Sequence, residues 1–253
     1  MVFVDHNNHE HLRTTKAGNP TLTEIDGISV HSVFQRLKNS AKFSKDRSKK
    51  TIGDNCPLVY ALKGKDGLRT NVTAIKLLFD DFDQIAQEIC AKIHGNFDCI
   101  APVPSSFPLA DCLANRLARR TGLPVYKSVF RKSKNHEAYG AIEPVFTMNP
   151  MSFDREDAKQ LRNALKRMKK IPDEDYTAKY VGVGVGVGVG VGVGVRRYFD
   201  PLQIANNNIP AGQRPLLVDD LLATGETLVS AKKLLLNGGG AAPSMAVTWF
   251  SNV

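Results

Sequence analysis

Two adjacent carboxylates, Asp219 and Asp220, stand between an apolar run and a short loop that contains Thr224 and Gly225. The apolar residues before them predict a strand, and the apolar-periodic run after the loop predicts a helix. A loop that opens a helix presents unpaired backbone N–H groups and the positive end of the helix dipole, which attract a phosphate. Neighbouring carboxylates accept hydrogen bonds from neighbouring sugar hydroxyls. The stretch therefore predicts a site for a ribose that carries a phosphate.

The loop supplies the groups that would hold the phosphate. Thr224 and Thr227 can donate hydroxyl hydrogen bonds, and Gly225 lets the backbone approach an anion closely. The predicted phosphate-binding residues are Ala223, Thr224, Gly225, Glu226 and Thr227. The plainer interpretation is that any α/β protein can end a strand with two aspartates before a helix, without a ligand.

The stretch 215–227 resembles the phosphoribosyl-diphosphate (PRPP) signature of type I phosphoribosyltransferases: apolar residues, an acidic pair, two apolar residues and a Thr-Gly-x-Thr loop. It departs at Pro215, where the family usually has an apolar strand residue. The resemblance implies an enzyme that transfers the phosphoribosyl group of PRPP to a nitrogen base and releases diphosphate. It implies that Asp219 and Asp220 are catalytic and bind the ribose diol, with Asp220 stabilising a ribosyl-cation-like transition state. Mg²⁺ is the expected cofactor, held largely by PRPP and water.

Two further segments carry residues that the resemblance assigns to the diphosphate. One follows a predicted strand that starts at residue 97 and precedes a predicted helix at 109–121. The other is a basic segment after a predicted strand at 123–130. The expected diphosphate-binding residues are Val103, Pro104, Ser105, Ser106, Arg131 and Lys132. The alternatives are a proline-kinked turn for the first segment and an ordinary surface for the second, His136 included.

Two features are similar to the ComF-like branch of the family, which is named after a bacterial DNA-uptake protein. They are the Pro102-Val103-Pro104 run, and a predicted strand at 57–62 that leads into Lys63-Gly64 and a long helix. That branch often carries a zinc ribbon, and this chain has no Cys-x-x-Cys pair to form one. The similarity leaves two alternatives to catalysis open, namely sensing of PRPP or a nucleotide and a role around DNA.

The order of the predicted elements indicates the fold class. Strands near 57, 98, 123, 216 and 245, separated by helices such as 74–93 and 154–170, predict an α/β fold with a mainly parallel open sheet and helices on both faces. Residues 25–37 are expected to form a short strand and a helix. We expect a phosphoribosyltransferase-like domain at 51–253, after an N-terminal extension at 1–50 that is partly disordered. The Val-Gly repeat places a low-complexity insertion at 177–197.

Composition limits the partners. The net charge of +9 suits anionic partners, either PRPP or nucleic acid. The chain has no apolar run of about eighteen residues, so a membrane partner is not expected. The cysteines lack metal-site spacing, which favours reduced thiols and a cytoplasmic location, and His6, His9 and His11 are interpreted as a disordered tail rather than a metal site. The acceptor base and the oligomeric state, a homodimer included, are left open.

Overall fold

A five-stranded sheet forms the centre of the molecule in the computed structural model, which describes residues 2–4, 12–36, 61–64, 69–105, 107–176, 194–206 and 208–251. The strand order is β3-β4-β9-β8-β5, and each neighbouring pair is parallel except the β3–β4 hairpin. This arrangement confirms the mainly parallel sheet. The strands are β3 (Thr21–Ile25), β4 (Ile28–Phe34), β5 (Cys99–Pro102), β8 (Pro215–Leu221) and β9 (Met245–Phe250).

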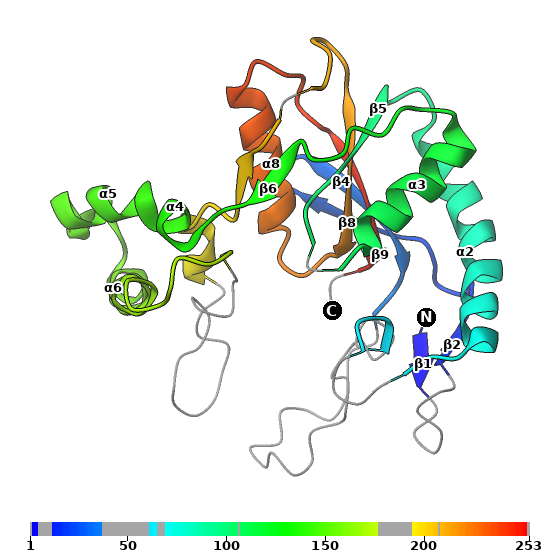
Figure 1. The fold of residues 1–253 in the computed structure, drawn as a ribbon, viewed down its shortest axis with the longest axis horizontal. Coiled ribbons are helices and arrows are strands. Elements are labelled where there is room, and N and C mark those ends of the chain that lie inside the picture. The colour runs from blue at the N-terminus through cyan, green and yellow to red at the C-terminus, as the bar shows by residue number, and fades with distance from the viewer. Residues whose placement is uncertain are drawn as a thin grey trace.

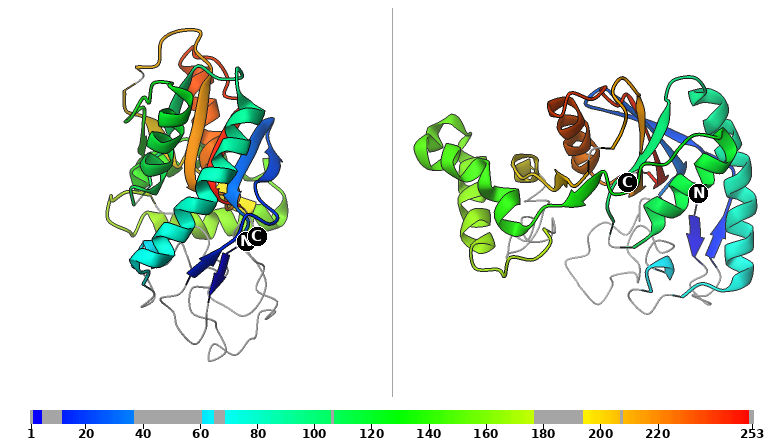
Figure 2. Two further views of the ribbon diagram at one scale, coloured as in Figure 1. Left: turned by 90° about the vertical axis from the view of Figure 1, so that its right-hand side faces the viewer. Right: turned by 45° about the horizontal axis from the view of Figure 1, so that its top comes forward.

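Helices cover both faces of the sheet (Figure 1; Figure 2). On one face lie α2 (Val72–Ile93) and α3 (Leu109–Thr121), whose buried apolar stripes pack against alternate residues of β8 and β9. On the other face lies α8 (Glu226–Asn237), which packs against the intervening residues. Because side chains alternate along a strand, one short apolar strand can serve both cores. The predicted helices at 74–93 and 109–121 are confirmed.

A helical appendage, residues 130–176 and 194–204, extends from one side of the sheet (Figure 1). Its base is an antiparallel pair of β6 (Phe130–Lys132) with β7 (Leu202–Ile204). Its helices enclose a separate apolar cluster that includes Leu161, Leu165 and Met168. The elements between the two strands are α4 (Asn135–Gly140), α5 (Ile142–Met148), the 3₁₀ turn η2 (Pro150–Ser152), α6 (Arg155–Met168) and the 3₁₀ turn η3 (Gly194–Tyr198).

The predicted strand at 123–130 is wrong for most of its length. Only Val125 makes a parallel bridge, to Ile100 of β5, and the chain then turns before β6 begins. Pro124 has no N–H to donate to a ladder, and Ser128 has a φ of 60°, which no extended strand adopts. The apolar alternation therefore continues through a turn rather than a strand.

Two further predicted elements differ from the structure. The predicted helix within 25–37 is absent from its described part, because residues 25–34 complete β3 and form β4, joined by a turn in which Asp26 and Gly27 both have positive φ values. Of the predicted strand at 57–62, Ala61 and Leu62 lie in a helical turn and the remainder lies outside the described residues. Burial of β4 between β3 and β9 overrides the weak local helical pattern.

Part of the N-terminal segment forms strands and contacts α2. The short strands β1 (Val2–Val4) and β2 (Leu12–Thr14) pair with each other, and Lys16 forms a 2.8 Å ion pair with Glu88 of α2. The boundary at residue 50 stays a prediction, although β3 and β4 belong to the central sheet. The three N-terminal histidines and nearly all of the Val-Gly repeat lie outside the described residues. Within the described part, no helix is both long and apolar enough to cross a membrane.

Candidate functional site

The two aspartates lie at the carboxyl edge of the sheet, where β8 ends beside its parallel neighbours β5 and β9. Asp219 follows Leu217 on the face that packs against α8, and Asp220 follows Val218 on the face toward α2 and α3. Their exposed fractions are 9% and 7%. The acids therefore flank one strand end at the edge where open parallel sheets bind their ligands.

Asp220 connects three distant parts of the chain. Its Oδ2 accepts hydrogen bonds from Lys63 Nζ and from Ser105 Oγ, each at 2.6 Å. The Lys63 and Asp220 side chains are only 14% and 10% exposed, so the ion pair is largely shielded from water. The structure thus brings a predicted diphosphate-loop residue, Ser105, to a predicted ribose-binding residue. Lys63 was not predicted as a site residue, and no spacing signal could have identified it across 157 residues.

Asp219 is held in a different environment from its neighbour. Its Oδ1 accepts a 2.7 Å hydrogen bond from the backbone N–H of Asp220. Burial, and then the charge of Asp220, raise the pKa of Asp219 to about 7. Near neutral pH this carboxyl group is therefore partly protonated, while Asp220 lies against Lys63.

The loop after the acids opens directly into α8. Gly225 precedes the helix with a φ of 84°, and no side chain caps the helix start. Ala223 is exposed, and Thr224 and Thr227 are partly exposed. The N–H groups of the first helical turn therefore have no side-chain acceptor at the cap, which is the arrangement that binds anions at helix starts.

Gly225 is also required by packing. A Cβ atom placed on it would lie 2.7 Å from Cδ1 of Ile25, at the end of β3. Its positive φ adds a second restriction, because L-residues with a side chain rarely adopt it. The β3–β4 hairpin thus supports the loop from below, and a glycine is the residue that fits between them.

Pockets open beside both predicted anion-binding segments. One of about 420 Å³ is lined by residues of the Pro102–Ser105 segment and by Lys127 and Ser128 from the turn before β6. Another of about 200 Å³ is lined by Thr224 and Glu226 and reaches the appendage at 197–201. Polar and cationic side chains therefore border open space on each side of the strand end.

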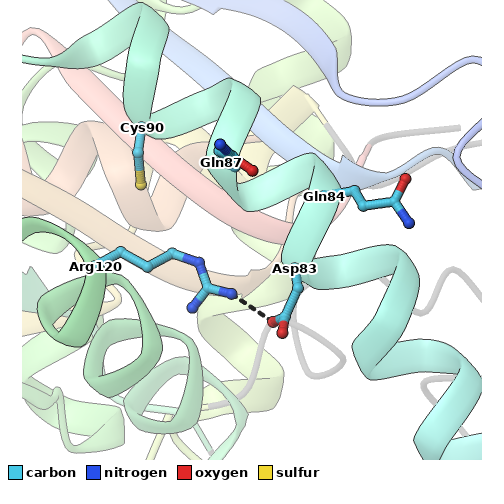
Figure 3. A pocket seen from close by; sticks show the side chains of 5 residues that line it. All are labelled: Asp83, Gln84, Gln87, Cys90 and Arg120. Carbon is cyan, nitrogen blue, oxygen red and sulfur yellow. Dashed lines mark hydrogen bonds and ion pairs between the residues drawn. The ribbon is translucent and has the colours of Figure 1, made fainter.

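A third pocket, of about 390 Å³, lies between α2 and α3 and is lined by none of the predicted site residues (Figure 3). Arg120 reaches from α3 to Asp83 of α2 with a 2.5 Å ion pair. Burial raises the pKa of the Cys90 thiol, so the cysteine in this pocket stays protonated at neutral pH. This pocket shows no feature that links it to the acids.

Residues of the predicted basic segment interact with carboxylates of the appendage. Arg131 donates two hydrogen bonds to the carboxylate of Glu137, at 2.7 and 2.6 Å. His136 Nδ1 lies 2.6 Å from a carboxylate oxygen of Asp173. Arg131 would have to leave Glu137 to bind a diphosphate, and Lys132 lies beside it in β6. Ser106 lies outside the described residues.

The fold and the site define an α/β protein with an acidic strand end and an anion-binding helix start. The sequence model of the phosphoribosyl transferase domain matches residues 69–252. The chain therefore belongs to the phosphoribosyl transferase domain family.

Curated relatives match a shorter segment. An adenine phosphoribosyltransferase of Clostridium botulinum is 49% identical over 47 residues, which cover 19% of this chain and 27% of that protein. One of Polynucleobacter asymbioticus is 48% identical over 40 residues, which cover 16% of this chain and 23% of that protein. The matched segment thus spans only about a quarter of these relatives.

Two solved structures are more distantly similar. Adenine phosphoribosyltransferase from Thermoanaerobacter pseudethanolicus aligns with 72% of this chain and 86% of its own, at 18% identity and a TM-score of 0.37. The enzyme from Saccharomyces cerevisiae aligns with 72% of this chain and 70% of its own, at 18% identity and a TM-score of 0.32.

Proposed function

We propose that the protein binds PRPP with Mg²⁺ and transfers the phosphoribosyl group to a nitrogen base, releasing diphosphate. The observation that supports this most is the hydrogen bond from Ser105 to Asp220 at the carboxyl edge of the sheet. The chain that contains this bond belongs to the phosphoribosyl transferase domain family. The ribose diol would lie against Asp219 and Asp220. The 5-phosphate would lie over residues 223–227, at the start of α8.

The reaction breaks the bond between C1 of the ribose and the diphosphate oxygen, and the acceptor nitrogen forms the new bond to C1. Positive charge develops on the sugar as the diphosphate leaves. A carboxylate in a site shielded from water stabilises that charge more than it would in solution, and Asp220 is the carboxylate we assign to this role. Val103 to Ser105 and, once released from Glu137, Arg131 with Lys132 would bind the departing diphosphate.

The donor set at the strand end suits Mg²⁺, which prefers oxygen ligands and keeps several waters. The carboxylates Asp219 and Asp220 are such donors, and the diol and diphosphate of PRPP would supply the others. Bound Mg²⁺ would neutralise charge on the leaving diphosphate. The residues of this chain would orient the sugar and exclude water from it.

The acceptor follows from the relatives, whose names specify adenine phosphoribosyltransferase. Adenine is therefore the first base to test, followed by the other purine and pyrimidine bases. We retain the ComF-like branch as a proposal on the strength of Pro102-Val103-Pro104 and Lys63-Gly64. A cytoplasmic location fits a pathway that consumes PRPP and remains a proposal as well.

The test is calorimetric titration of the full chain with PRPP and Mg²⁺, paired with a diphosphate-release assay on a panel of bases. We expect binding and base-dependent release in the native protein, and loss of both when Asp219→Asn and Asp220→Asn are combined. Unchanged PRPP affinity in the double variant would remove the site assignment. Tight binding without turnover on any base would indicate a PRPP sensor instead of an enzyme.

A further inference from the structure

The exposed side of α6 carries cations at regular helical spacing. They lie at intervals of three or four residues, so they share one face of the helix. From Arg155 to Lys166 the row spans about 16 Å along the helix axis, at about 1.5 Å per residue. We call this set the α6 basic stripe. Its members on the helix are Arg155, Lys159, Arg162 and Lys166, and Lys170 follows in the turn after the helix ends at Met168.

All five side chains of the stripe are exposed, and none has an ion-pair partner among the residues that the structure describes. The acids of α6 lie off this face. Asp157 is buried and bonds Arg197 and Tyr198. The Glu156 carboxylate accepts a 2.9 Å hydrogen bond from Gln160 on the flank of the helix. Among the described residues, the stripe therefore presents a row of cations without ion-pair partners.

This arrangement works against the stability of the helix itself. Like charges three and four residues apart destabilise a helix by about 0.2 to 0.5 kcal/mol per pair. Arg155 in the first turn is unfavourable to the helix dipole, whereas Lys166 in the last turn is favourable to it. Helix α6 carries both signs of charge, but the described residues of the stripe carry only positive charge, whereas a surface selected only for solubility intersperses the two signs. The stripe thus has a feature that folding alone does not account for.

We propose that the α6 basic stripe binds the phosphate backbone of a nucleic acid. A straight row of cations matches a linear polyanion, whose charges repeat at close intervals along its length. The stripe lies on the appendage, far from α2 and α3 at the other side of the sheet (Figure 1; Figure 2), so a long ligand can reach it. Exposed Asn163, beside the stripe on the same flank as Glu156, can add hydrogen bonds to the same ligand.

An anionic membrane is the competing partner, and the burial of α6 disfavours it. Membrane-surface helices insert an apolar face beneath the headgroups. The apolar side chains of α6, Leu161, Ala164, Leu165 and Met168, are instead buried inside the appendage. Exposed Met148 and Met151 lie on the neighbouring α5–η2 segment, so vesicles belong in the test.

The experiment measures binding of the full chain to a labelled oligonucleotide of about 20 residues, single-stranded and duplex, between about 50 and 200 mM salt. The stripe variant combines Lys159→Gln, Arg162→Gln and Lys166→Gln. The matched control combines Lys76→Gln, Lys92→Gln and Arg119→Gln, three exposed cations on α2 and α3. Both variants lose the same charge and keep every cation outside their own face. Circular dichroism verifies that both remain folded.

We expect the stripe variant to bind at least about tenfold more weakly, and its slope of log affinity against log salt to fall by about 2 to 3, since each phosphate contact contributes about 0.7 to 0.9. The control variant should bind like the native chain, and so should Lys159→Arg combined with Lys166→Arg. Equal loss in the stripe and control variants overturns the proposal. So does the absence of oligonucleotide binding, or stripe-dependent binding to phosphatidylserine vesicles alone. PRPP titration of the same variants reports separately on the proposed active site.

Discussion

The raised pKa of the buried Asp219 carboxyl group makes the stability of the fold depend on pH. In the unfolded chain Asp219 loses its proton near its ordinary pKa of 3.8, whereas in the folded chain it does so at about 7. A raised folded-state pKa contributes stability that is fully present below the lower value. That contribution is lost as pH rises toward 7. Ionisation of Asp219 therefore lowers the free energy of unfolding.

We predict that Asp219→Asn stabilises the protein at pH 8 and has little effect at pH 4. Asparagine keeps an oxygen that can accept the hydrogen bond from the N–H of Asp220, and it removes a buried charge. The expected gain is roughly 2 to 4 kcal/mol, at about 1.4 kcal/mol per pKa unit. Urea denaturation at both pH values measures it. A gain of the same size at pH 4 would contradict the explanation by ionisation.

Lys63 is expected to matter through Asp220. Removing the cation with Lys63→Met leaves a shielded carboxylate with only the hydroxyl of Ser105 as side-chain partner, which costs about 2 to 4 kcal/mol of folding stability. We also expect PRPP affinity to fall at least about tenfold, because the Lys63 ammonium would no longer hold the Asp220 carboxylate in position. A tenfold loss corresponds to about 1.4 kcal/mol of binding free energy.

The conservative change Lys63→Arg is the control for that prediction. It keeps the positive charge and should retain most of the stability and PRPP affinity, as calorimetric titration and chemical denaturation would show. Tighter PRPP binding by Lys63→Met would mean that the ammonium competes with the ribose for Asp220. The role of Lys63 would then be the opposite of the one expected here.

At the scale of elements, the loop before α8 depends on the strand packed beneath it. We predict that Gly225→Ala destabilises the protein by about 2 to 4 kcal/mol, through a positive φ and a Cβ contact with Ile25 at 2.7 Å. It should also weaken PRPP binding by displacing the phosphate loop. Thermal denaturation and PRPP titration measure the two effects.

Gly122, at the end of α3, provides a matched control. It has a φ of 73°, and a Cβ there would meet nothing within 4 Å. Gly122→Ala should therefore cost only about 1 to 2 kcal/mol and leave PRPP binding unchanged. Adding Ile25→Ala to Gly225→Ala should recover part of the lost stability. If the two glycine variants behave alike, the contact with Ile25 is unimportant.

The elements also show which parts of the site could be predicted from sequence. The strand, acidic pair, loop and helix at 216–237 were predictable because their apolar periods and breaker residues are local. The pairing of Lys63 with Asp220 was not, because contacts across 157 residues leave no periodic trace. The strand predicted at 123–130 was wrong because the prediction rested on the apolar alternation and gave too little weight to Pro124, which has no N–H to donate to a strand ladder. The β6–β7 pair joins segments that are far apart in the sequence, so its pairing leaves no local signal either.

At the scale of the whole molecule, the two apolar cores of the sheet and the one in the appendage are separate clusters. We predict that Leu161→Ala lowers the local stability of the appendage by about 2 to 5 kcal/mol and leaves the sheet unchanged. Native-state hydrogen exchange should then speed up at amides of α4 and α6 but not at those of β8 and β9. Leu117→Ala, on α3, should give the reverse pattern. Uniform acceleration in either variant would show that the cores unfold as one unit.

The position of β4 between β3 and β9 has a consequence for synthesis on the ribosome. Ser32 and Thr248 share a 2.8 Å hydrogen bond across 216 residues, so a strand made early finds its partner only after nearly all intervening segments have emerged. Its buried apolar side chains stay uncovered during that interval, and pairings at such separation form slowly. Until β9 is synthesised, the edge of β4 that later pairs with β9 stays unpaired. We expect chaperones that bind exposed strand edges to bind the nascent chain at this edge.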